Sequence, residues 1–510
     1  MKMKKHFVYI IAIMFAAVFA FGSCAPRAGM GAVEEGTLVV IVPTFPVTLD
    51  NTRTNDFNSN LVNRNWVETL VNFDGPEWNI VPNLAESWEM PDPQTVIFHL
   101  RRGVRFHNGN EMRASDVAFS IMRGVYSPAV RFILNPIQSV DVIDDHTVQV
   151  NLHLPFTPIL SHLTHPGAGI TCERTVRALG DDFANGPIGT GPFKFSSMSL
   201  GEYVELARFE DYWGPQPAVE RIRVNVVPEA ANRLIEVETG AGHIAFDISP
   251  HHFPRMRDDP SLNYDRVPIP RIHFLGFNLQ TTNALPLRDV RVRQAIHHAI
   301  DVEAIVDTVY QGIGLRAFGP MVGIPGVVDF PPYEFNLTRA RQLMAEAGYA
   351  DGFTATLWNT VANQQEVDKS VIIQNMLAQI NINVEIVSLE FATFLSGVTA
   401  GQQDMHVLSW NNLMSDPDYG LLLFHSSNIG ASNRFRYSNP EVDRLLDMGR
   451  AELNPDVRLD IYKEAQRIIR DDLPAVFMLY GEELVAVSPR IGGFANFPIR
   501  SPRFNTVFFN

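Results

Sequence analysis

Two pairs of adjacent histidines are the first candidates for chemistry, because imidazole is a common metal ligand and general base. They are His251-His252 and His297-His298. Neighbouring residues on a helix point about 100° apart, so His297 and His298 are poorly placed to bind one ion together. His251-His252 has no cysteine or carboxylate cluster at ligand spacing. The sequence therefore predicts hydrogen-bonded or solvated histidines and no metal site.

Sequence motifs for catalysis or nucleotide binding are incomplete in this chain. No Gly-x-Ser-x-Gly elbow and no His-Glu-x-x-His zinc motif occurs. Gly189-Thr-Gly-Pro-Phe-Lys-Phe195 contains two glycines but neither the Gly-Lys-Ser/Thr of a P-loop nor a third dinucleotide-binding glycine. A tight structural turn is the better interpretation. The residues thus give no positive support for an enzyme, and we expect no cofactor.

Two short segments place tryptophan beside amides. Trp410 precedes Asn411 and Asn412, and Trp358 precedes Asn359. Aromatic rings can stack on a sugar while amides bond to it, so these residues suit an oligosaccharide. The same residue types are ordinary in cores and turns, and they suit a peptide as well.

Length and charge limit the class of protein. The chain has 510 residues, a net charge of −15 and a pI near 5.5. Such acidity argues against nucleic acid as a partner, because nucleic acid requires clustered Lys and Arg. A chain of this length is too long for one hydrophobic core and suits two or more lobes.

The first residues have the pattern of an export signal. Lys2, Lys4 and Lys5 precede an apolar run over 7–21, and Gly22-Ser23-Cys24 follows. We therefore expect a signal peptide over 1–23 and a tether over 24–36. The pattern resembles a bacterial lipoprotein signal, which implies lipidation of Cys24. An ordinary secretory peptide or an uncleaved anchor are the alternatives. Lipidation would leave Cys172 without a disulfide partner.

Residues 84–116 form the most informative segment. Thr95–Leu100 is β-branched and aromatic, as expected of a strand, and Arg102-Gly103 predicts a turn. Val104–His107 alternates apolar with polar residues, which predicts a second strand with Arg105 and His107 facing outward. Asn108-Gly109 predicts another turn, and Ser115 is the expected cap of the following helix.

This segment resembles the signature of the family 5 extracellular solute-binding proteins, the peptide, nickel and oligosaccharide receptors of ABC transporters. The family pattern is roughly P-x-LAxSW, then FxLRxGVxFHxG, then xAxDV. The matching residues are Pro82, Leu84, Ala85, Ser87, Trp88, Phe98, Leu100, Arg101, Gly103, Val104, Phe106, His107, Gly109, Ala114, Asp116 and Val117. The resemblance implies a binding protein and not an enzyme.

Further landmarks extend the resemblance from about Thr37 to the C-terminus. They are Phe45-Pro-Val-Thr-Leu-Asp50, the GTGPF-like run at 189–193, Asp211-Tyr-Trp-Gly214, Phe274–Asn278, and Asp289–Asp301. Val292, Ala295, Ile296 and Ala299 recur at helical spacing, so that helix has a buried face. Separate strands are expected over 476–480 and 483–487.

The expected fold is α/β, a two-lobed periplasmic-binding-protein fold with two interlobe crossings and an extra subdomain in the first lobe. Lobe I is predicted to comprise 37–273 and 485–510, with the subdomain at about 66–182, and lobe II 274–484. Two crossings form a hinge that a ligand can close by binding the closed state better.

The resemblance also implies how a ligand is held. Peptide-binding relatives carry an acidic residue three positions after the tryptophan of the Trp410 loop, where Leu413 stands here. Either the ammonium anchor is missing, or Asp416 or Asp418 replaces it. An Arg expected after Thr356-Leu-Trp358 is also absent, because 354–404 contains none. The predicted ligand-binding residues are Phe45, Trp358, Asn359, Trp410, Asn411, Asn412, Asp416 and Asp418.

Free dipeptides therefore fit poorly, and longer peptides bound through their backbones fit better. We expect an exported protein in the periplasm or at the envelope surface, anchored by lipid at Cys24. It would deliver oligopeptides to ABC permease subunits with cytoplasmic ATPases. An oligosaccharide or metal-chelate receptor and a sensory receptor are the alternatives.

Overall fold

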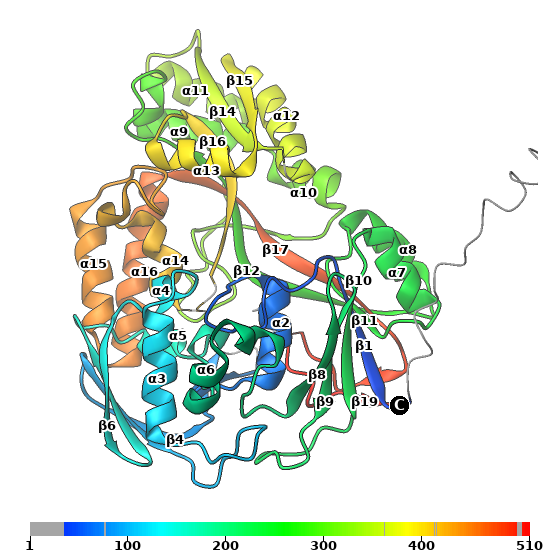
Figure 1. The fold of residues 1–510 in the computed structure, drawn as a ribbon. Coiled ribbons are helices and arrows are strands. Elements are labelled where there is room, and N and C mark those ends of the chain that lie inside the picture. Colours follow the sequence, from blue (N-terminus) through cyan, green and yellow to red (C-terminus); the bar gives the residue numbers. More distant parts are fainter. Residues whose placement is uncertain (1–34, 76–77, 362, 413, 415, 497–501) are drawn as a thin grey trace, which may run out of the picture.

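The computed structural model describes residues 35–75, 78–361, 363–412, 414, 416–496 and 502–510. One mixed β-sheet runs through both lobes and forms the frame of the molecule (Figure 1). Its strand order is β15-β14-β16-β12-β17-β11-β1-β10-β9-β8, with β13 (Leu315–Arg316) beside β17. The second lobe contributes the first three strands and the first lobe the last five, so the two lobes share one hydrogen-bonded sheet.

Two long strands cross between the lobes. They are β12 (Asn263–Phe277) and β17 (Ala475–Val487), and they pair antiparallel. In Figure 1 both run from the upper lobe down into the lower body. The crossing near 274–278 is therefore longer than expected, and the two strands expected over 476–480 and 483–487 are one continuous strand. The expected two-lobed α/β fold is confirmed.

The second lobe, at the top of Figure 1, is an α/β unit built on three strands. β14 pairs parallel with both β15 and β16. Helices cover this sheet, and their apolar faces meet it in one core that includes Leu357, Ile373 and Val407. The elements are α9 (Val290–Ala299), α10 (Val302–Tyr310), α11 (Leu337–Glu346), β14 (Phe353–Thr360), α12 (Gln364–Ala378), β15 (Ile382–Leu389), α13 (Phe391–Ala400) and β16 (Met405–Asn411).

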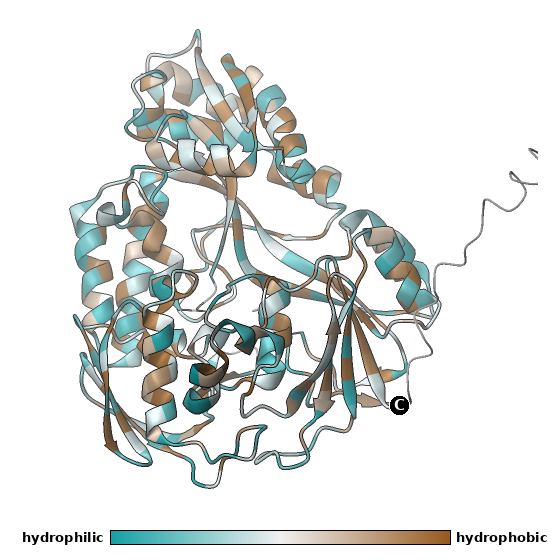
Figure 2. Cartoon of the chain, viewed as in Figure 1, coloured by the Kyte–Doolittle hydropathy of each residue, from teal (hydrophilic) through white to brown (hydrophobic). Residues whose placement is uncertain are grey.

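The first lobe is built around β1, in which all six residues are buried. A strand buried on both faces reads as a continuous apolar run, and Thr37-Leu-Val-Val-Ile-Val42 fits that rule. Figure 2 colours the strands of this lobe mostly hydrophobic. The elements are β1 (Thr37–Val42), α2 (Phe57–Trp66), β8 (Phe193–Ser199), β9 (Tyr203–Arg208), β10 (Arg221–Val226), α7 (Ala230–Glu238), β11 (Ile244–Ala245) and α8 (Phe253–Asp258).

A separate four-stranded sheet forms a subdomain beside the first lobe, with the order β4-β5-β7-β6. Its core contains Phe98, Phe106 and Ile121, all fully buried. A two-stranded ribbon of β2 and β3 lies next to it in sequence. The elements are β2 (Val71–Asp74), β3 (Asn79–Pro82), β4 (Ala85–Asp92), β5 (Thr95–Leu100), α3 (Ala114–Val125), α4 (Arg131–Leu134), β6 (Ile137–Asp144), β7 (Thr147–Leu152), α5 (Ile159–His162) and α6 (Glu173–Leu179).

Three late helices, α14 (Pro417–Leu421), α15 (Pro440–Ala451) and α16 (Pro455–Asp472), connect the second lobe to the subdomain. Their core includes residues of β12 and β17. The Trp78 indole donates to the Gly323 carbonyl at 2.7 Å, and the Thr157 amide donates to the Arg450 carbonyl at 2.7 Å. The chain ends in a short ribbon of β18 (Ile491–Gly492) and β19 (Phe508–Phe509).

The signature segment confirms some local predictions and corrects others. β5 covers Thr95–Leu100 as expected. Val104–His107 does not form a strand: Arg105 makes only an isolated antiparallel bridge with Glu111, and the His107 amide donates to the Gly189 carbonyl. His107 does not face outward: its Nε2 lies 3.0 Å from the Gly191 carbonyl. The cap of α3 is Arg113, with Asp116 bonding back to its amide, and not Ser115.

None of the helices in the described part of the chain is long and apolar enough to span a bilayer. Cys172 is buried and unpaired there. The signal and tether residues up to 34, including Cys24, lie outside the described residues.

The interlobe cleft as candidate ligand site

The pairing of the two crossing strands is interrupted where they pass between the lobes. Pro268 pairs with Glu482, and the next pair is Ile272 with Tyr480. Residues 269–271 of β12 thus face Gly481 alone on β17. A Cβ added at Gly481 would come within 3.2 Å of the Ile269 side chain and 3.3 Å of Arg271 Cβ. Glycine therefore makes room for the side chains of the opposite strand at this break.

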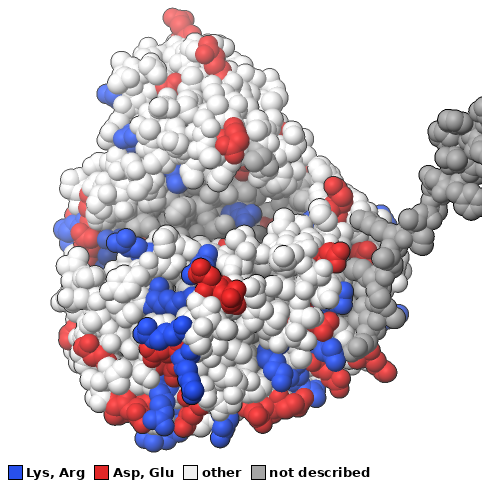
Figure 3. All heavy atoms as spheres, viewed as in Figure 1, with Lys and Arg blue, Asp and Glu red and all other residues white. Residues whose placement is uncertain are grey.

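A cavity of about 570 Å³ lies at this break. Figure 3 shows the same face of the molecule hollowed between the upper lobe and the lower body. Both lobes and both crossings contribute to the wall of this interlobe cavity. Its residues include Arg233 and 247–251 from the first lobe, 269, 271 and 273 from β12, 479 and 481–484 from β17, and Tyr310, 363–365 and Ser409 from the second lobe.

Arg271 brings a cation to the second-lobe wall of the cavity. It pairs in register with Asn411 of β16, and its Nε donates to Asn411 Oδ1 at 2.5 Å. His273 lies two residues further on the same face of the strand. Ile272, between them, belongs to the core around α15 and α16 on the opposite face.

Four titratable side chains behind this wall form what we call the cleft cluster: His273, Tyr310, Glu366 and Lys369. Lys369 Nζ lies 2.8 Å from Glu366 Oε2 and 3.4 Å from His273 Nδ1. Burial raises the pKa of Glu366, but the Lys369 ammonium and the His273 ring together outweigh burial and hold that pKa at about 2. Burial and Lys369 together lower the pKa of His273 to about 4. The cluster therefore holds a Lys–Glu ion pair beside a neutral histidine at neutral pH.

The first-lobe wall is fixed by Arg233. Its guanidinium donates to the carbonyls of Phe246 at 3.1 Å, Val227 at 3.0 Å and Pro228 at 2.6 Å, and also to that of Asp247. These bonds hold the turn that leads into 247–251. On the crossing strands, Arg266 and Glu482 form an ion pair with 2.6 Å between Nη2 and Oε2. Arg233 and Arg266 are therefore each bonded to other protein groups beside the cavity.

The Trp410 loop lies at the end of β16, where Trp410 stacks on Tyr419 with ring centroids 5.4 Å apart. The Asn412 amide donates to the Pro270 carbonyl at 2.7 Å, and its side chain donates to the Asp416 carbonyl at 2.9 Å. The structure thus brings Trp410, Asn411 and Asn412 together next to the β12 break. Leu413 lies outside the described residues.

Asp416 and Asp418 are buried and engaged in ion pairs. Both guanidinium Nη atoms of Arg458 bond to Asp416, at 2.7 and 3.0 Å, and Arg450 Nε bonds to Asp418 at 2.7 Å. Asp416 also caps α14. Because an anchor for a ligand ammonium needs a carboxylate that is not already neutralised, we assign both aspartates to the frame of the loop.

The remaining predicted ligand residues lie apart from the cavity. Trp358 lies against Gly397 of α13, inside the second lobe. Asn359 is fully buried at the end of β14, and neither polar atom of its side chain has a partner among the described residues. Phe45 packs against the first-lobe core. Their ligand roles remain predictions.

Sequence reasoning missed Arg271 and the cleft cluster, because no motif marks them. Arg271 and His273 stand just ahead of the recognised 274–278 landmark, but only tertiary pairing brings α12 and β16 to them. The stretch 354–404 contains no Arg, and Arg271 comes from β12, a different part of the chain.

His297 and His298 each contact a neighbouring residue of the protein. His297 stacks on Tyr333 with ring centroids 4.0 Å apart, and burial lowers its pKa to about 3. His298 Nδ1 lies 2.7 Å from the Glu334 carbonyl. Throughout the described part of the chain, no group of three or more His, Cys, Asp or Glu could hold an ion.

Several family landmarks converge on Glu68, which is fully buried. Its carboxylate accepts from Thr190 Oγ1 at 3.0 Å, Tyr212 Oη at 2.9 Å and Trp213 Nε1 at 2.8 Å. The Arg503 guanidinium lies 3.9 Å away. The GTGPF-like and DYWG-like runs thus meet on one acceptor, and their role is to hold the first lobe to the subdomain. We call these four bonded residues the Glu68 knot.

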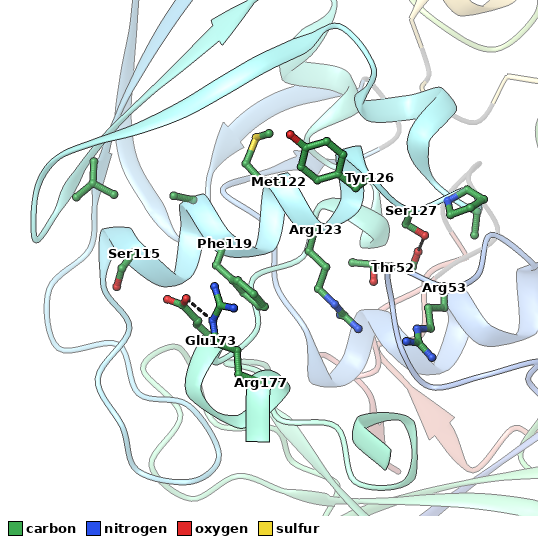
Figure 4. A pocket seen from close by; sticks show the side chains of 14 residues that line it. Thr52, Arg53, Ser115, Phe119, Met122, Arg123, Tyr126, Ser127, Glu173 and Arg177 are labelled. Carbon is green, nitrogen blue, oxygen red and sulfur yellow. Dashed lines mark hydrogen bonds and ion pairs between the residues drawn. The ribbon is translucent and has the colours of Figure 1, made fainter. Parts of the chain in front are cut away.

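A larger hollow of about 1140 Å³ lies against α3, away from the interlobe cavity. Figure 4 shows Arg177 beside Phe119 and bonded to Glu173. Arg123 and Arg53 at its other end pair with Asp50 and Asp181. Its charged groups are therefore engaged with one another, so we place the candidate ligand site in the interlobe cavity.

The fold and the cavity define a two-lobed binding protein of the periplasmic type. The chain belongs to the bacterial extracellular solute-binding proteins of family 5, whose middle region matches residues 79–432. Heme-binding protein A of Haemophilus influenzae is 28% identical over 475 residues, covering 86% of each chain. The dipeptide-binding protein of Escherichia coli is 27% identical over 475 residues, covering 86% of this chain and 88% of its own.

Two solved structures support the same assignment. HbpA2 from Haemophilus parasuis has a TM-score of 0.87 at 28% identity, covering 93% of this chain and 100% of its own. The DppA binding protein from Helicobacter pylori, in complex with the peptide STSA, has a TM-score of 0.77 at 27% identity. That alignment covers 93% of this chain and 98% of the DppA chain.

Proposed function

We propose that this protein captures oligopeptides outside the cytoplasm by closing its lobes and delivers them to an ABC permease for import. The observation that carries the proposal is the interlobe cavity at the broken pairing of β12 and β17. A ligand there contacts both lobes at once, so it stabilises a closed state over an open one. Relatives with the names dipeptide-binding protein and glutathione-binding protein support a peptide ligand.

The cavity suits binding and not turnover. Its neighbouring charges are engaged in the Lys369–Glu366 and Arg266–Glu482 pairs, and Arg233 is bonded to carbonyls. A general acid or base must reach a proton of the ligand, and each of these groups is already bonded to another group of the protein. We therefore propose a receptor that leaves its ligand unchanged.

The proposal includes export through a signal peptide and anchoring by lipid. We infer that 1–23 is removed as a signal peptide and that Cys24 carries the lipid that holds the protein at the membrane. Several acyl chains together would anchor it firmly, whereas one chain binds only weakly. We also propose the division into lobe I, over 37–273 and 485–510 with a subdomain at about 66–182, and lobe II over 274–484.

Two measurements test capture and closure. Mass spectrometry of ligand retained through purification should identify peptides. Small-angle scattering should show a smaller radius of gyration when such a peptide is added, with a change in tryptophan fluorescence. Identical dimensions at saturating peptide, or retained ligand that contains no peptide bond, would contradict the proposal.

The anchor has its own test. Cys24→Ala should move the protein from the membrane fraction to the soluble fraction, with its thermal unfolding unchanged, because the tether lies outside the lobes. Cys172→Ala is the matched control and should stay membrane-bound. Unchanged membrane association of the Cys24 variant would show that an uncleaved helix holds the protein.

A further inference from the structure

His273 lies between two neighbouring strands on the second-lobe wall of the interlobe cavity. It pairs in register with Ser409 of β16 and Leu479 of β17. Residues that pair across a sheet present their side chains on the same face, and all three of these residues line the cavity. The His273 side chain is nevertheless buried, with 5% of the residue exposed. Its imidazole is therefore a buried polar group at the edge of an open space.

The Nδ1 atom of His273 faces the two members of the cleft cluster that lie behind the wall. Lys369 Nζ lies 3.4 Å from Nδ1, and Glu366 Oε1 lies 3.7 Å from it. The Tyr310 hydroxyl lies 3.5 Å from the same atom. The two nitrogens of an imidazole point in nearly opposite directions. Since Nδ1 is directed at the cluster, Nε2 is directed at the cavity that the ring lines.

Lys369 determines which ring nitrogen of His273 carries the proton. Its ammonium is 0% exposed and can only donate hydrogen bonds, so its protons need acceptors inside the protein. Glu366 Oε2 accepts one at 2.8 Å, and the lone pair of Nδ1 accepts another. The 3.7 Å between Nδ1 and Glu366 Oε1 is too long for a competing hydrogen bond. The proton of the neutral ring is therefore on Nε2.

The wall thus presents one oriented N–H group to the cavity. Among the residues that the structure describes, the hydrogen bonds of the His273 ring all involve Nδ1. A buried donor without an acceptor costs free energy, so a ligand that brings an acceptor to Nε2 gains that bond. The donor is uncharged, because burial and the Lys369 ammonium lower the pKa of His273 to about 4. A neutral acceptor, such as an amide carbonyl, matches it without a counter-charge.

We propose that His273 is a ligand-binding residue that donates its Nε2–H to a backbone carbonyl of the captured peptide. Lys369 is the positioning residue that keeps the proton on that nitrogen. This inference rests on the proposed function and names the part of the peptide that contacts the second-lobe wall. Because every peptide has backbone carbonyls, the bond selects for a peptide without selecting its side chains.

Nitrogen NMR of the full chain with isotope-labelled histidine tests the tautomer. The couplings between ring protons and ring nitrogens differ between the two neutral tautomers, and the His273 signals are those that His273→Asn removes. We expect a single Nε2–H form at neutral pH. The double variant Glu366→Leu/Lys369→Met removes both charges together and should populate both tautomers. An Nδ1–H ring in the wild type would overturn the inference.

Two amide variants separate a ligand contact from a structural histidine. His273→Asn keeps an acceptor near the position of Nδ1, for Lys369, but loses the group that reaches the cavity. His273→Gln extends an amide donor to about the position of Nε2. In calorimetry with N-acetyl tetra-alanine amide, we expect the Asn variant to bind at least about fivefold more weakly than the wild type, and the Gln variant within about twofold of it. His99→Asn, at a half-exposed site on β5, is the control and should bind like the wild type.

Thioamide analogues of the same probe identify the acceptor. Each analogue replaces one carbonyl oxygen by sulfur, which accepts hydrogen bonds more weakly. At one position this change should weaken binding to the wild type by at least about threefold. It should cost nothing further in His273→Asn, because the bond is already absent there.

Several outcomes would overturn the inference while leaving peptide capture intact. They are wild-type affinity in His273→Asn, and a thioamide effect that is undiminished in that variant. If His273→Asn unfolds, an Nε2 proton signal that does not shift when the probe binds the wild type overturns the inference equally. Failure of the wild type to bind this probe, or any natural peptide, would contradict the proposed function itself.

Discussion

The Glu68 knot and the wall of the interlobe cavity differ in how their polar side chains are bonded. At Glu68, three donors from two distant landmarks converge on one carboxylate and leave no room for a ligand. At the cavity, Arg271 bonds to the Asn411 amide across two paired strands and lines open space. Family landmarks therefore identify the frame of this protein, whereas residues that no landmark marks line its candidate site. Substitutions in the first region should change stability, and those in the second should change selectivity.

The largest effect is expected from Glu68→Ala. Removing the carboxylate strands the Thr190, Tyr212 and Trp213 donors in a fully buried site, at a cost of about 4 kcal/mol in the free energy of unfolding. Urea denaturation measures this cost. Glu68→Gln keeps one acceptor and should lose less. A cost below about 1 kcal/mol for the alanine variant would show that the knot does not support the frame.

Asp416→Asn tests whether the Trp410 loop belongs to the frame or to the ligand. The change leaves the buried Arg458 guanidinium without its counter-charge, so we expect a loss of about 2–3 kcal/mol. Preference for free over N-acetylated peptides should stay unchanged in calorimetry. Loss of that preference at full stability would return Asp416 to the ligand site.

His406 gives a pH-dependent prediction. It is fully buried in the second lobe, neither ring nitrogen has a partner among the described residues, and burial lowers its pKa to about 3. Because the unfolded chain binds this proton near pH 6.5, stability is complete above that pH and falls as the pH drops toward 3.

Between pH 7 and pH 5 this residue alone should remove about 2 kcal/mol from the free energy of unfolding. His406→Leu should lose less stability over that interval, by the same amount. His99→Leu, at a half-exposed site on β5, is the control. Equal pH dependence in His406→Leu and the wild type would show that His406 is not kept neutral by burial.

The smallest effect on stability is expected from Arg271→Gln. Its side chain is partly exposed, so the change should cost less than about 1 kcal/mol. Equilibrium unfolding in urea measures this cost. A cost as large as that of Glu68→Ala would place Arg271 in the frame and remove the contrast between the two regions.

Local patterns predicted the elements that local forces determine. The β-branched run 95–100 is a strand, and the periodic helix 289–301 begins and ends within two residues of its expected limits. The same kind of alternation predicted a strand at 104–107 that does not form, because its pairing with the following segment stops at the single bridge between Arg105 and Glu111. The His107 amide donates to the Gly189 carbonyl instead.

The site was harder to predict than the fold, because it depends on register between distant segments. Arg271 meets Asn411 across 140 residues, and α12 reaches the same wall from a third segment. Asp416 and Asp418 have the chemistry of anchors, but their arginine partners lie on α15 and α16, 32 and 42 residues further along the chain. Residue type alone does not show which charged side chains already form ion pairs within the protein.

The unequal break between the crossing strands bears on the geometry of lobe rotation. On β17 a single residue, Gly481, spans the break, whereas 269–271 span it on β12. The shorter span cannot lengthen, so we expect the rotation axis to pass close to Gly481 while β12 swings through the larger arc. Pro270 has a fixed φ, so Ile269 and Arg271 must absorb most of the torsional change. Arg271, whose side chain lines the interlobe cavity, would then also turn its own backbone, so that lobe rotation changes the cavity wall at this Cα.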